Sequence, residues 1–139
     1  MEIEINNFST IEAETSFLKK VAERVLLEEG KKGHSLSIAL VDGKVIRRAN
    51  KSYRGKDAET DVLSFADFET EKFPGQEKFL GEIILCPGQI KDGKKGMAKT
   101  LIHGILHLLG HNHSGSEGEE RKMREKEAYY LSVLGKREK

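Results

Sequence analysis

The chain has 139 residues, 34% of which are charged, and its formal net charge at pH 7 is +1. This length suits one domain with its own core, and no apolar run approaches the ~20 residues of a membrane span. Cys86 is the single cysteine, which excludes an internal disulfide and favours a reducing location. We therefore expect a single cytoplasmic domain over residues 1–139, with no membrane partner.

The first predicted elements are a strand and a helix. Residues 2–6 alternate between apolar and polar side chains, which predicts a short strand. Ser9 and Glu12 have the spacing of a capping box, so we expect a helix to follow directly. A glycine at position 30 or 33 is expected to end this helix.

A second strand and a basic segment come next. Residues 35–41 are rich in aliphatic side chains and predict a strand, and residues 45–52 predict a short basic helix. Between Lys44 and Lys56 there are six basic residues and no acidic one. Such a cluster is usually a solvated helix face, but it also suits a phosphate-rich substrate.

The middle of the chain predicts a hairpin. Residues 62–68 form one expected strand, the polar run 69–78 a loop, and residues 82–86 the returning strand. Pro87 suits the first turn of a helix. Gly93 and Gly96 are expected to interrupt the chain before the next long helix. Four lysines precede that helix and form a second basic cluster: Lys91, Lys94, Lys95 and Lys99.

Residues 97–109 predict a buried helix that carries two histidines. His103 and His107 are four residues apart, so their imidazoles share one helix face and can bind one metal ion at roughly 2.0–2.1 Å. Gly110 supplies the left-handed residue that ends a helix, so His113 can return as a third ligand. A lone histidine on an apolar helix is usually a core residue bonded to a carbonyl, but three at this spacing indicate a metal site.

Three histidine ligands with a fourth position open to water are typical of catalytic zinc, so we expect one Zn²⁺ per chain. His111 is expected beside the site rather than as a ligand, because four protein ligands would close it. The spacing also matches the metzincin proteases, but Gly104 stands where a protease has its glutamate base. A metalloprotease-like hydrolase remains an alternative.

The last predicted element is a helix over residues 117–134, which Gly135 is expected to stop. Together these elements predict one α+β domain with an approximately four-stranded mixed sheet and helices packed around it.

Two stretches resemble the signatures of the YbeY family, the metal-dependent endoribonucleases of ribosomal RNA maturation. The first is HGILHLLGHNH at residues 103–113, and the second is N-x-x-Y-R-x-x-D-x-x-T-D-V-L-S-F at residues 50–65. Their order, their spacing and the chain length fit the family over essentially the whole chain. The resemblance implies a zincin-like histidine helix with His103, His107 and His113 as zinc ligands, and Arg54 beside the metal.

The resemblance also implies a cytoplasmic enzyme that cleaves single-stranded RNA. Its expected roles are maturation of the 3′ end of small-subunit ribosomal RNA and ribosome quality control, with the small ribosomal subunit as partner. The alternative is a non-catalytic ribosome-assembly factor with structural zinc. Two positions depart from the family pattern. Asn112 replaces the usual aspartate before the third histidine, and Glu82 replaces the aspartate that commonly follows glycine in the preceding strand. A carboxylate at position 112 is therefore not available to the mechanism.

We predict Arg54 and His107 as catalytic residues, with Arg54 holding the scissile phosphate as a planar fork of donors. The alternative for Arg54 is a surface ion pair with Asp57 or Asp61. The residues predicted to bind the RNA backbone are Arg47, Arg48, Lys51, Arg54, Lys95 and Lys99. The general base stays open among Glu82, Asp61 and His111, and each of the two carboxylates could instead orient a ligand imidazole.

Overall fold

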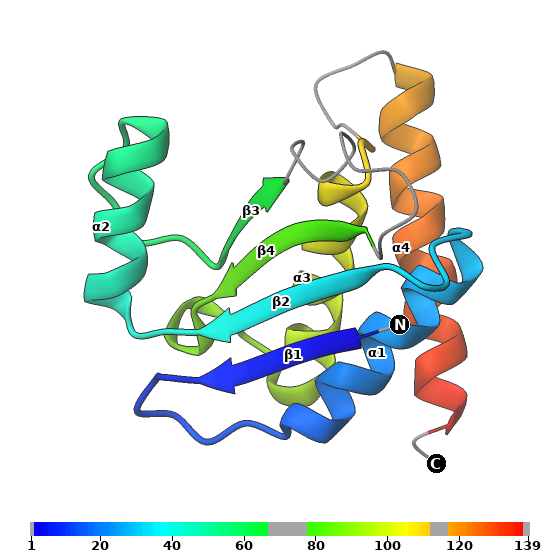
Figure 1. Ribbon diagram of the computed structural model, residues 1–139, viewed down its shortest axis with the longest axis horizontal. Helices are drawn as coiled ribbons and strands as arrows, with labels where there is room; N and C mark the ends of the chain where they lie inside the picture. The colour runs from blue at the N-terminus through cyan, green and yellow to red at the C-terminus, as the bar shows by residue number, and fades with distance from the viewer. Residues whose placement is uncertain (1, 67–77, 112–116, 138–139) are drawn as a thin grey trace.

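The sheet has four strands in the order β1-β2-β4-β3 (Figure 1). The structure is a computed structural model that describes residues 2–66, 78–111 and 117–137, with side chains as far as Leu134. Strands β1 (Glu2–Asn7), β2 (Ser35–Leu40) and β4 (Phe79–Leu85) run parallel, and β3 (Val62–Ala66) pairs antiparallel with β4. The predicted α+β domain with a mixed four-stranded sheet is therefore confirmed.

Three helices pack on one face of this sheet and enclose the main core with it. They are α1 (Thr15–Glu28), α3 (Gly93–Leu108) and α4 (Glu117–Arg137). Strand β2 shows why: its alternate residues Leu36, Ile38 and Leu40 are buried in that core, whereas the residues between them are half-buried on the other face. None of the helices that the structure describes is long and apolar enough to cross a membrane.

Helix α2 (Gly43–Arg54) packs on the opposite face of the sheet and stands apart from the other helices (Figure 1). A second, smaller core of Val41, Ile46, Leu63 and Cys86 attaches it there. Cys86 is 1% exposed, as expected for a small core residue.

The loop after α2 is held by Asn50, which is 3% exposed. The side-chain Nδ2 of Asn50 donates to the backbone carbonyl of Ala58 at 2.9 Å, and the backbone carbonyl of Asn50 accepts from the N–H of Lys56 at 3.3 Å. Gly55 ends α2 in the left-handed conformation, with φ at 70°. These contacts fix the path of the chain from Arg54 to the start of β3.

The predicted capping box is wrong, because α1 begins at Thr15 and not after Ser9. The Ser9 hydroxyl donates to Asn7 Oδ1 at 2.7 Å, and the backbone N–H of Thr10 donates to Asp42 Oδ1 at 2.9 Å. These bonds stabilise a loop between β1 and α1, so the side chain that would cap a helix binds elsewhere.

Two glycines predicted to break helices lie inside them. Gly96 belongs to α3, where a Cβ atom would lie 1.7 Å from the carbonyl oxygen of Lys91, so the close approach of that backbone requires glycine. Helix α4 continues through Gly135 to Arg137. Gly30, with φ at 76°, follows the end of α1 as predicted. The expected hairpin loop at residues 69–78 lies, except for Lys78, outside the described residues.

A short 3-10 helix, η2 (Pro87–Gln89), follows β4, and Pro87 occupies its first turn as expected.

Candidate metal-binding site

Helix α3 directs His103 and His107 to one side, away from its buried stripe of aliphatic residues. The two ring centroids are 4.6 Å apart and the ring planes meet at 64°. Both residues line a cavity of about 600 Å³ that also borders β3 and the end of α2. Two imidazoles one turn apart on one cavity wall are a donor pair suited to a single transition metal.

Gly104 sets how closely α3 approaches the sheet. Its carbonyl accepts from the Ser64 hydroxyl at 3.0 Å, and a Cβ atom at this position would lie 3.0 Å from Cγ2 of Val62 and 3.4 Å from Cγ2 of Ile83. A side chain at position 104 would therefore enter the packing between α3 and the sheet. The glutamate base of a metalloprotease has no room at this position.

Glu127 of α4 holds the ring of His103. Its Oε1 lies 2.6 Å from Nδ1 of His103, and the two side chains are 13% and 32% exposed. An ionised carboxylate only accepts hydrogen bonds, so in a neutral imidazole this contact favours the tautomer with the proton on Nδ1 and the lone pair on Nε2. Carboxylates that fix a ligand imidazole in this way are typical of zinc sites.

The sequence analysis assigned no role to Glu127. A carboxylate on the same helix stripe as Met123, Tyr130 and Leu134, all of them buried, was the available signal. The sequence could not show that its partner is His103.

His113 and Asn112 lie outside the described residues, so the third predicted ligand has no position here. The chain does turn back at the end of α3, where Gly110 has φ at 100°. The N–H groups of Gly110 and His111 donate to the carbonyls of His107 and Leu106, each at 3.0 Å. Within the described parts of the chain, no group of three metal-binding side chains is present. His103, His107 and the supporting Glu127 nevertheless fit a zinc ion in the nature and placement of their donors.

Arg54, the last residue of α2, lines the same cavity as the two histidines. The alternative of an ion pair with Asp57 is not what the structure shows. Asp57 instead accepts from Nε of Arg47 at 2.7 Å, and this bond lowers the pKa of the Asp57 carboxyl. Among the described residues no ion pair joins Arg54 to Asp57 or Asp61, so its guanidinium is available to a ligand.

The other predicted RNA-binding residues are distributed unevenly around the histidines. Lys99 lines a second cavity of about 330 Å³, whose wall also includes His103 and Glu127. Arg48, Lys51 and Lys95 are exposed and line neither of these cavities. The structure therefore brings Arg54 and Lys99 close to the histidines and places the rest on the surface around them.

The three candidates for the general base have different positions. Asp61 lines both cavities that contain His103. Glu82 is exposed on the sheet face opposite α3, because its neighbour Ile83 is buried in the main core. Nε2 of His111 is bonded to Oε1 of Glu29 at 3.0 Å. Asp61 is therefore the best placed of the three.

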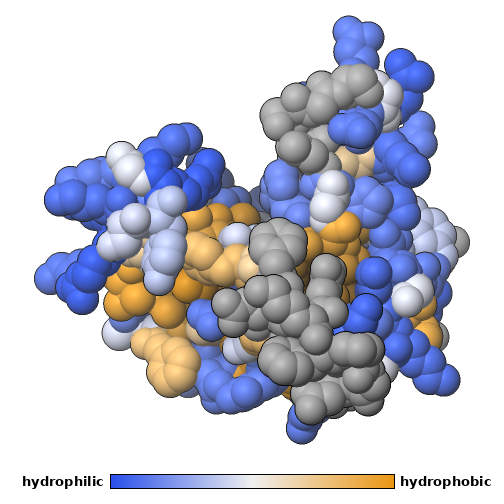
Figure 2. All heavy atoms as spheres, turned by 45° about the horizontal axis from the view of Figure 1, so that its top comes forward, coloured by the Kyte–Doolittle hydropathy of each residue, from blue (hydrophilic) through white to orange (hydrophobic). Residues whose placement is uncertain are grey.

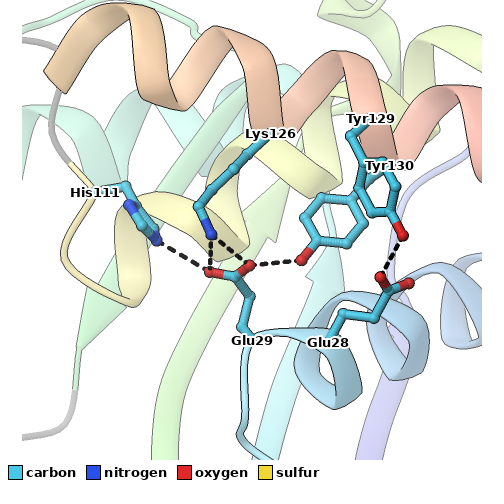
Figure 3. Close-up of polar contacts among 6 residues, drawn as sticks. All are labelled: Glu28, Glu29, His111, Lys126, Tyr129 and Tyr130. Carbon is cyan, nitrogen blue, oxygen red and sulfur yellow. Dashed lines mark hydrogen bonds and ion pairs between the residues drawn. The ribbon is translucent and has the colours of Figure 1, made fainter. Parts of the chain in front are cut away.

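Glu29 forms a buried polar cluster behind the site, at the junction of α1, α3 and α4 (Figure 3). Its side chain is 8% exposed and accepts from His111, from Lys126 at 2.8 Å and from the hydroxyl of Tyr130 at 2.5 Å. Burial alone would raise the pKa of Glu29, but the three hydrogen bonds outweigh burial and lower it. Burial and the contact with Glu29 raise the pKa of Tyr130.

This cluster ties the turn that follows α3 to the other two helices. His111 is the last residue described before position 117, and it lies two positions before the predicted ligand His113. The sequence analysis expected His111 beside the metal site. The structure shows that its partner is Glu29, which is 82 positions away in the sequence, so no local pattern could have identified this contact.

Comparisons with known proteins agree on one family. The family model described as "Endoribonuclease YbeY" matches residues 2–135. A protein of that name from Aquifex aeolicus is 38% identical over 86% of this chain and 83% of its own length. Its namesake from Carboxydothermus hydrogenoformans is 37% identical over 95% of this chain and 96% of its own. A solution structure from Thermotoga maritima aligns with a TM-score of 0.60 and 26% identity, covering 95% of this chain and 88% of that one.

Proposed function

The chain belongs to the YbeY family of endoribonucleases, hydrolases that cleave RNA, and we propose that it cleaves single-stranded ribosomal RNA with the help of one zinc ion. We further propose that this cleavage matures the 3′ end of small-subunit ribosomal RNA and serves ribosome quality control. The observation that supports a metal-dependent reaction is the meeting of His103, His107, Arg54 and Asp61 in one cavity.

Zinc would be held by His103, His107 and His113. The chemistry that zinc supplies in such a site is a water activated near neutral pH and a polarised phosphoryl oxygen. Glu127 keeps the proton of His103 on Nδ1 and thereby presents Nε2 to the metal. Gly104 lets α3 lie close against β3, which fixes the helix that carries both histidines.

Arg54 and Asp61 would act on the substrate. The planar guanidinium of Arg54 binds the non-bridging oxygens of the scissile phosphate and stabilises the charge that develops there as the phosphorus–oxygen bond breaks. Asp61 orients the attacking water and accepts its proton at a carboxylate oxygen. The water oxygen bonds to phosphorus as the bond to the leaving ribose oxygen breaks, and that oxygen takes a proton from solvent. The backbone carbonyl of Asp61 accepts from the N–H of Cys86 at 2.9 Å, which anchors this residue at the start of β3.

The central test is cleavage of a labelled, unstructured RNA by the purified zinc-loaded protein. His107→Ala should abolish the endonucleolytic products, whereas His34→Ala, which changes a histidine that does not line the cavity, should cleave like the wild type. Equal products from wild type and His107→Ala would reveal a contaminating nuclease and contradict the assignment. If the wild type gives no products, the catalytic proposal fails and the assembly-factor alternative gains support.

A second test separates substrate binding from metal binding. Arg54→Ala should lower cleavage by roughly 100-fold, the loss typical when one donor to a developing anion is removed, with zinc content unchanged. Arg24→Ala, which removes a half-buried arginine of α1 that does not line the cavity, is the control. Loss of zinc from the Arg54 variant would show instead that Arg54 supports the structure of the site.

A further inference from the structure

Tyr53 is a large aromatic residue that the fold leaves uncovered. It lies on the same face of α2 as the buried Ile46 and Asn50, but one turn further along, and it is 74% exposed. Its ring meets that of Phe65 on β3 with centroids 4.9 Å apart and planes at 61°. In Figure 2 the hydrophilic surface of α2, on the left, borders a hollow in which hydrophobic residues are exposed.

Tyr53 lies at the cavity of the two histidines. Tyr53 and Phe65 line this cavity together with Arg54, His103 and His107. An open aromatic ring, a cation next to it in the sequence and two metal-binding side chains thus border one space. The aromatic ring and the cation match the two parts of a nucleotide, because a base stacks on an aromatic ring and a phosphate binds a guanidinium.

The surrounding charge favours the same class of ligand. Lys51 and Arg54 flank Tyr53 on the last turn of α2, and Lys56 follows on the loop. A tyrosine that served only to attach α2 would be expected to bury its ring, as Ile46 does. The Tyr53 hydroxyl forms no hydrogen bond with any residue that the structure describes, so no polar contact accounts for the position of the ring.

We infer that Tyr53, held by its contact with Phe65, is a stacking platform for one base of the RNA strand next to the cleaved phosphate. This inference rests on the proposed function and adds to it a base-binding subsite. Stacking on an aromatic face tolerates every base, so the platform selects for unpaired nucleotides and not for a sequence. A paired base would have to leave its helix to reach the ring.

The first test measures KM and kcat with a short labelled oligouridine. Tyr53→Leu should raise KM by about 5- to 150-fold, the range for losing one base–aromatic stack, while kcat at saturating RNA changes little. Tyr53→Phe keeps the ring and should behave like the wild type. An unchanged KM in Tyr53→Leu would overturn the inference while leaving the proposed cleavage intact.

The second test locates the stacked base. In a series of oligouridines, each with one abasic nucleotide, a single position near the cleaved bond should raise KM for the wild type. The same abasic nucleotide should have no further effect on Tyr53→Leu, because both changes remove one interaction. Equal sensitivity of the two proteins at every position would contradict a base-binding role for Tyr53.

A third test reports binding without cleavage. The chain has no tryptophan, so Tyr53→Trp introduces one tryptophan at the platform, whose fluorescence can be excited selectively over that of the two remaining tyrosines. Oligouridine should quench its fluorescence, and Phe8→Trp, at a residue that is 70% exposed in the loop after β1, should not respond. Quenching at position 53 without RNA cleavage would support the subsite and refute the proposed reaction. Cleavage without quenching would refute the base-binding subsite and support the proposed reaction.

Discussion

At the scale of single residues, the contact between Glu127 and His103 supports the proposal that His103 binds a metal. A bare imidazole can carry its proton on either nitrogen, and only one tautomer presents Nε2 as a ligand. The carboxylate of Glu127 favours that tautomer and holds the ring, although the two residues are 24 positions apart in the sequence. Folding thus fixes the orientation of the His103 ring without the help of a metal ion.

We therefore expect Glu127→Ala to weaken zinc binding by about 10- to 100-fold, the usual effect of removing a carboxylate that supports a ligand histidine. Competition with a fluorescent chelator measures this. Glu125→Ala removes the same charge from an exposed position of α4 and should bind zinc like the wild type. An unchanged affinity in Glu127→Ala, with the helical circular dichroism preserved, would show that the contact does not orient the ligand.

Gly104 is a second residue whose role depends on packing. In an exposed helix, alanine is more favourable than glycine by about 0.5–1 kcal/mol, so Gly→Ala usually stabilises. Here the added Cβ would press on Val62, Ser64 and Ile83 at 3.0–3.4 Å, and overpacking of this kind costs about 1–3 kcal/mol. We expect the second effect to be larger. Gly104→Ala should lower the free energy of unfolding by about 1 kcal/mol in urea titrations with an unchanged m-value, and a gain in stability would mean that β3 moves aside.

At the scale of elements, the Glu29 cluster links the three helices that cover one face of the sheet. Glu29 follows the end of α1, His111 follows α3, and Lys126 and Tyr130 lie on α4. Three donor groups make four hydrogen bonds to this carboxylate, because Nζ of Lys126 contacts both of its oxygens (Figure 3). A buried carboxylate with this many donors stabilises the fold only while it is ionised.

This arrangement predicts how stability depends on pH. The folded-state pKa of Glu29 lies below its ordinary value of 4.5, so its contribution is complete above that pH and is lost as pH falls through the folded pKa. Glu29→Gln should be less stable at pH 7, by on the order of 2 kcal/mol, and should lose less stability than the wild type on acidification below pH 4.5. Thermal unfolding between pH 3 and 7 measures both effects.

The neighbouring Glu28 provides a matched control for this measurement. Its pKa is also lowered, first by the hydroxyl of Tyr129 and then by Arg24, but its side chain is 26% exposed. Because solvent screens such contacts, Glu28→Gln should change the acid response less than Glu29→Gln does. Equal responses of the two variants would show that the burial of Glu29 adds nothing to its role.

The elements also show what a sequence can and cannot predict. Strand β2 and the histidine face of α3 follow from periodicity, because a repeat of two or of four residues decides which side chains share a face. The capping box at Ser9 failed because Asn7 binds its hydroxyl, and Gly96 failed as a breaker because the backbone of Lys91 lies against it. Both failures come from contacts within a few residues that the capping-box and helix-breaker patterns do not take into account.

At the scale of the whole molecule, the candidate site combines local and long-range parts. The pair His103 and His107 could be predicted, since one helical turn separates them. The supporting carboxylate of Glu127 and the meeting of Arg54 with the histidines depend on how α2, α3 and α4 pack around the sheet. Only the resemblance to a known family related Arg54 to the metal before the fold was known.

The charge of the whole molecule gives little attraction for RNA, because the net charge is only +1. Electrostatic attraction for RNA must therefore come from a local concentration of basic residues. Arg47, Lys51 and Arg54 are spaced four and three residues apart, so they form one basic stripe along α2 that ends at the cavity of the histidines. Asp57 already binds Arg47, so the three cations of this stripe are not equivalent.

We expect RNA binding to weaken steeply with salt, with each phosphate contact contributing about 0.7 to the slope of log Kd against log salt concentration. Titrations in the His107→Ala background avoid cleavage. Lys51→Gln should lower the slope by about one contact, and Arg47→Gln by less, because the carboxylate of Asp57 lies 2.7 Å from Nε of Arg47 and offsets its charge. Lys19→Gln, on the exposed side of α1, should leave the slope unchanged. A slope that is flat in the parent protein, or lowered equally by all three substitutions, would mean that RNA does not follow α2 to the site.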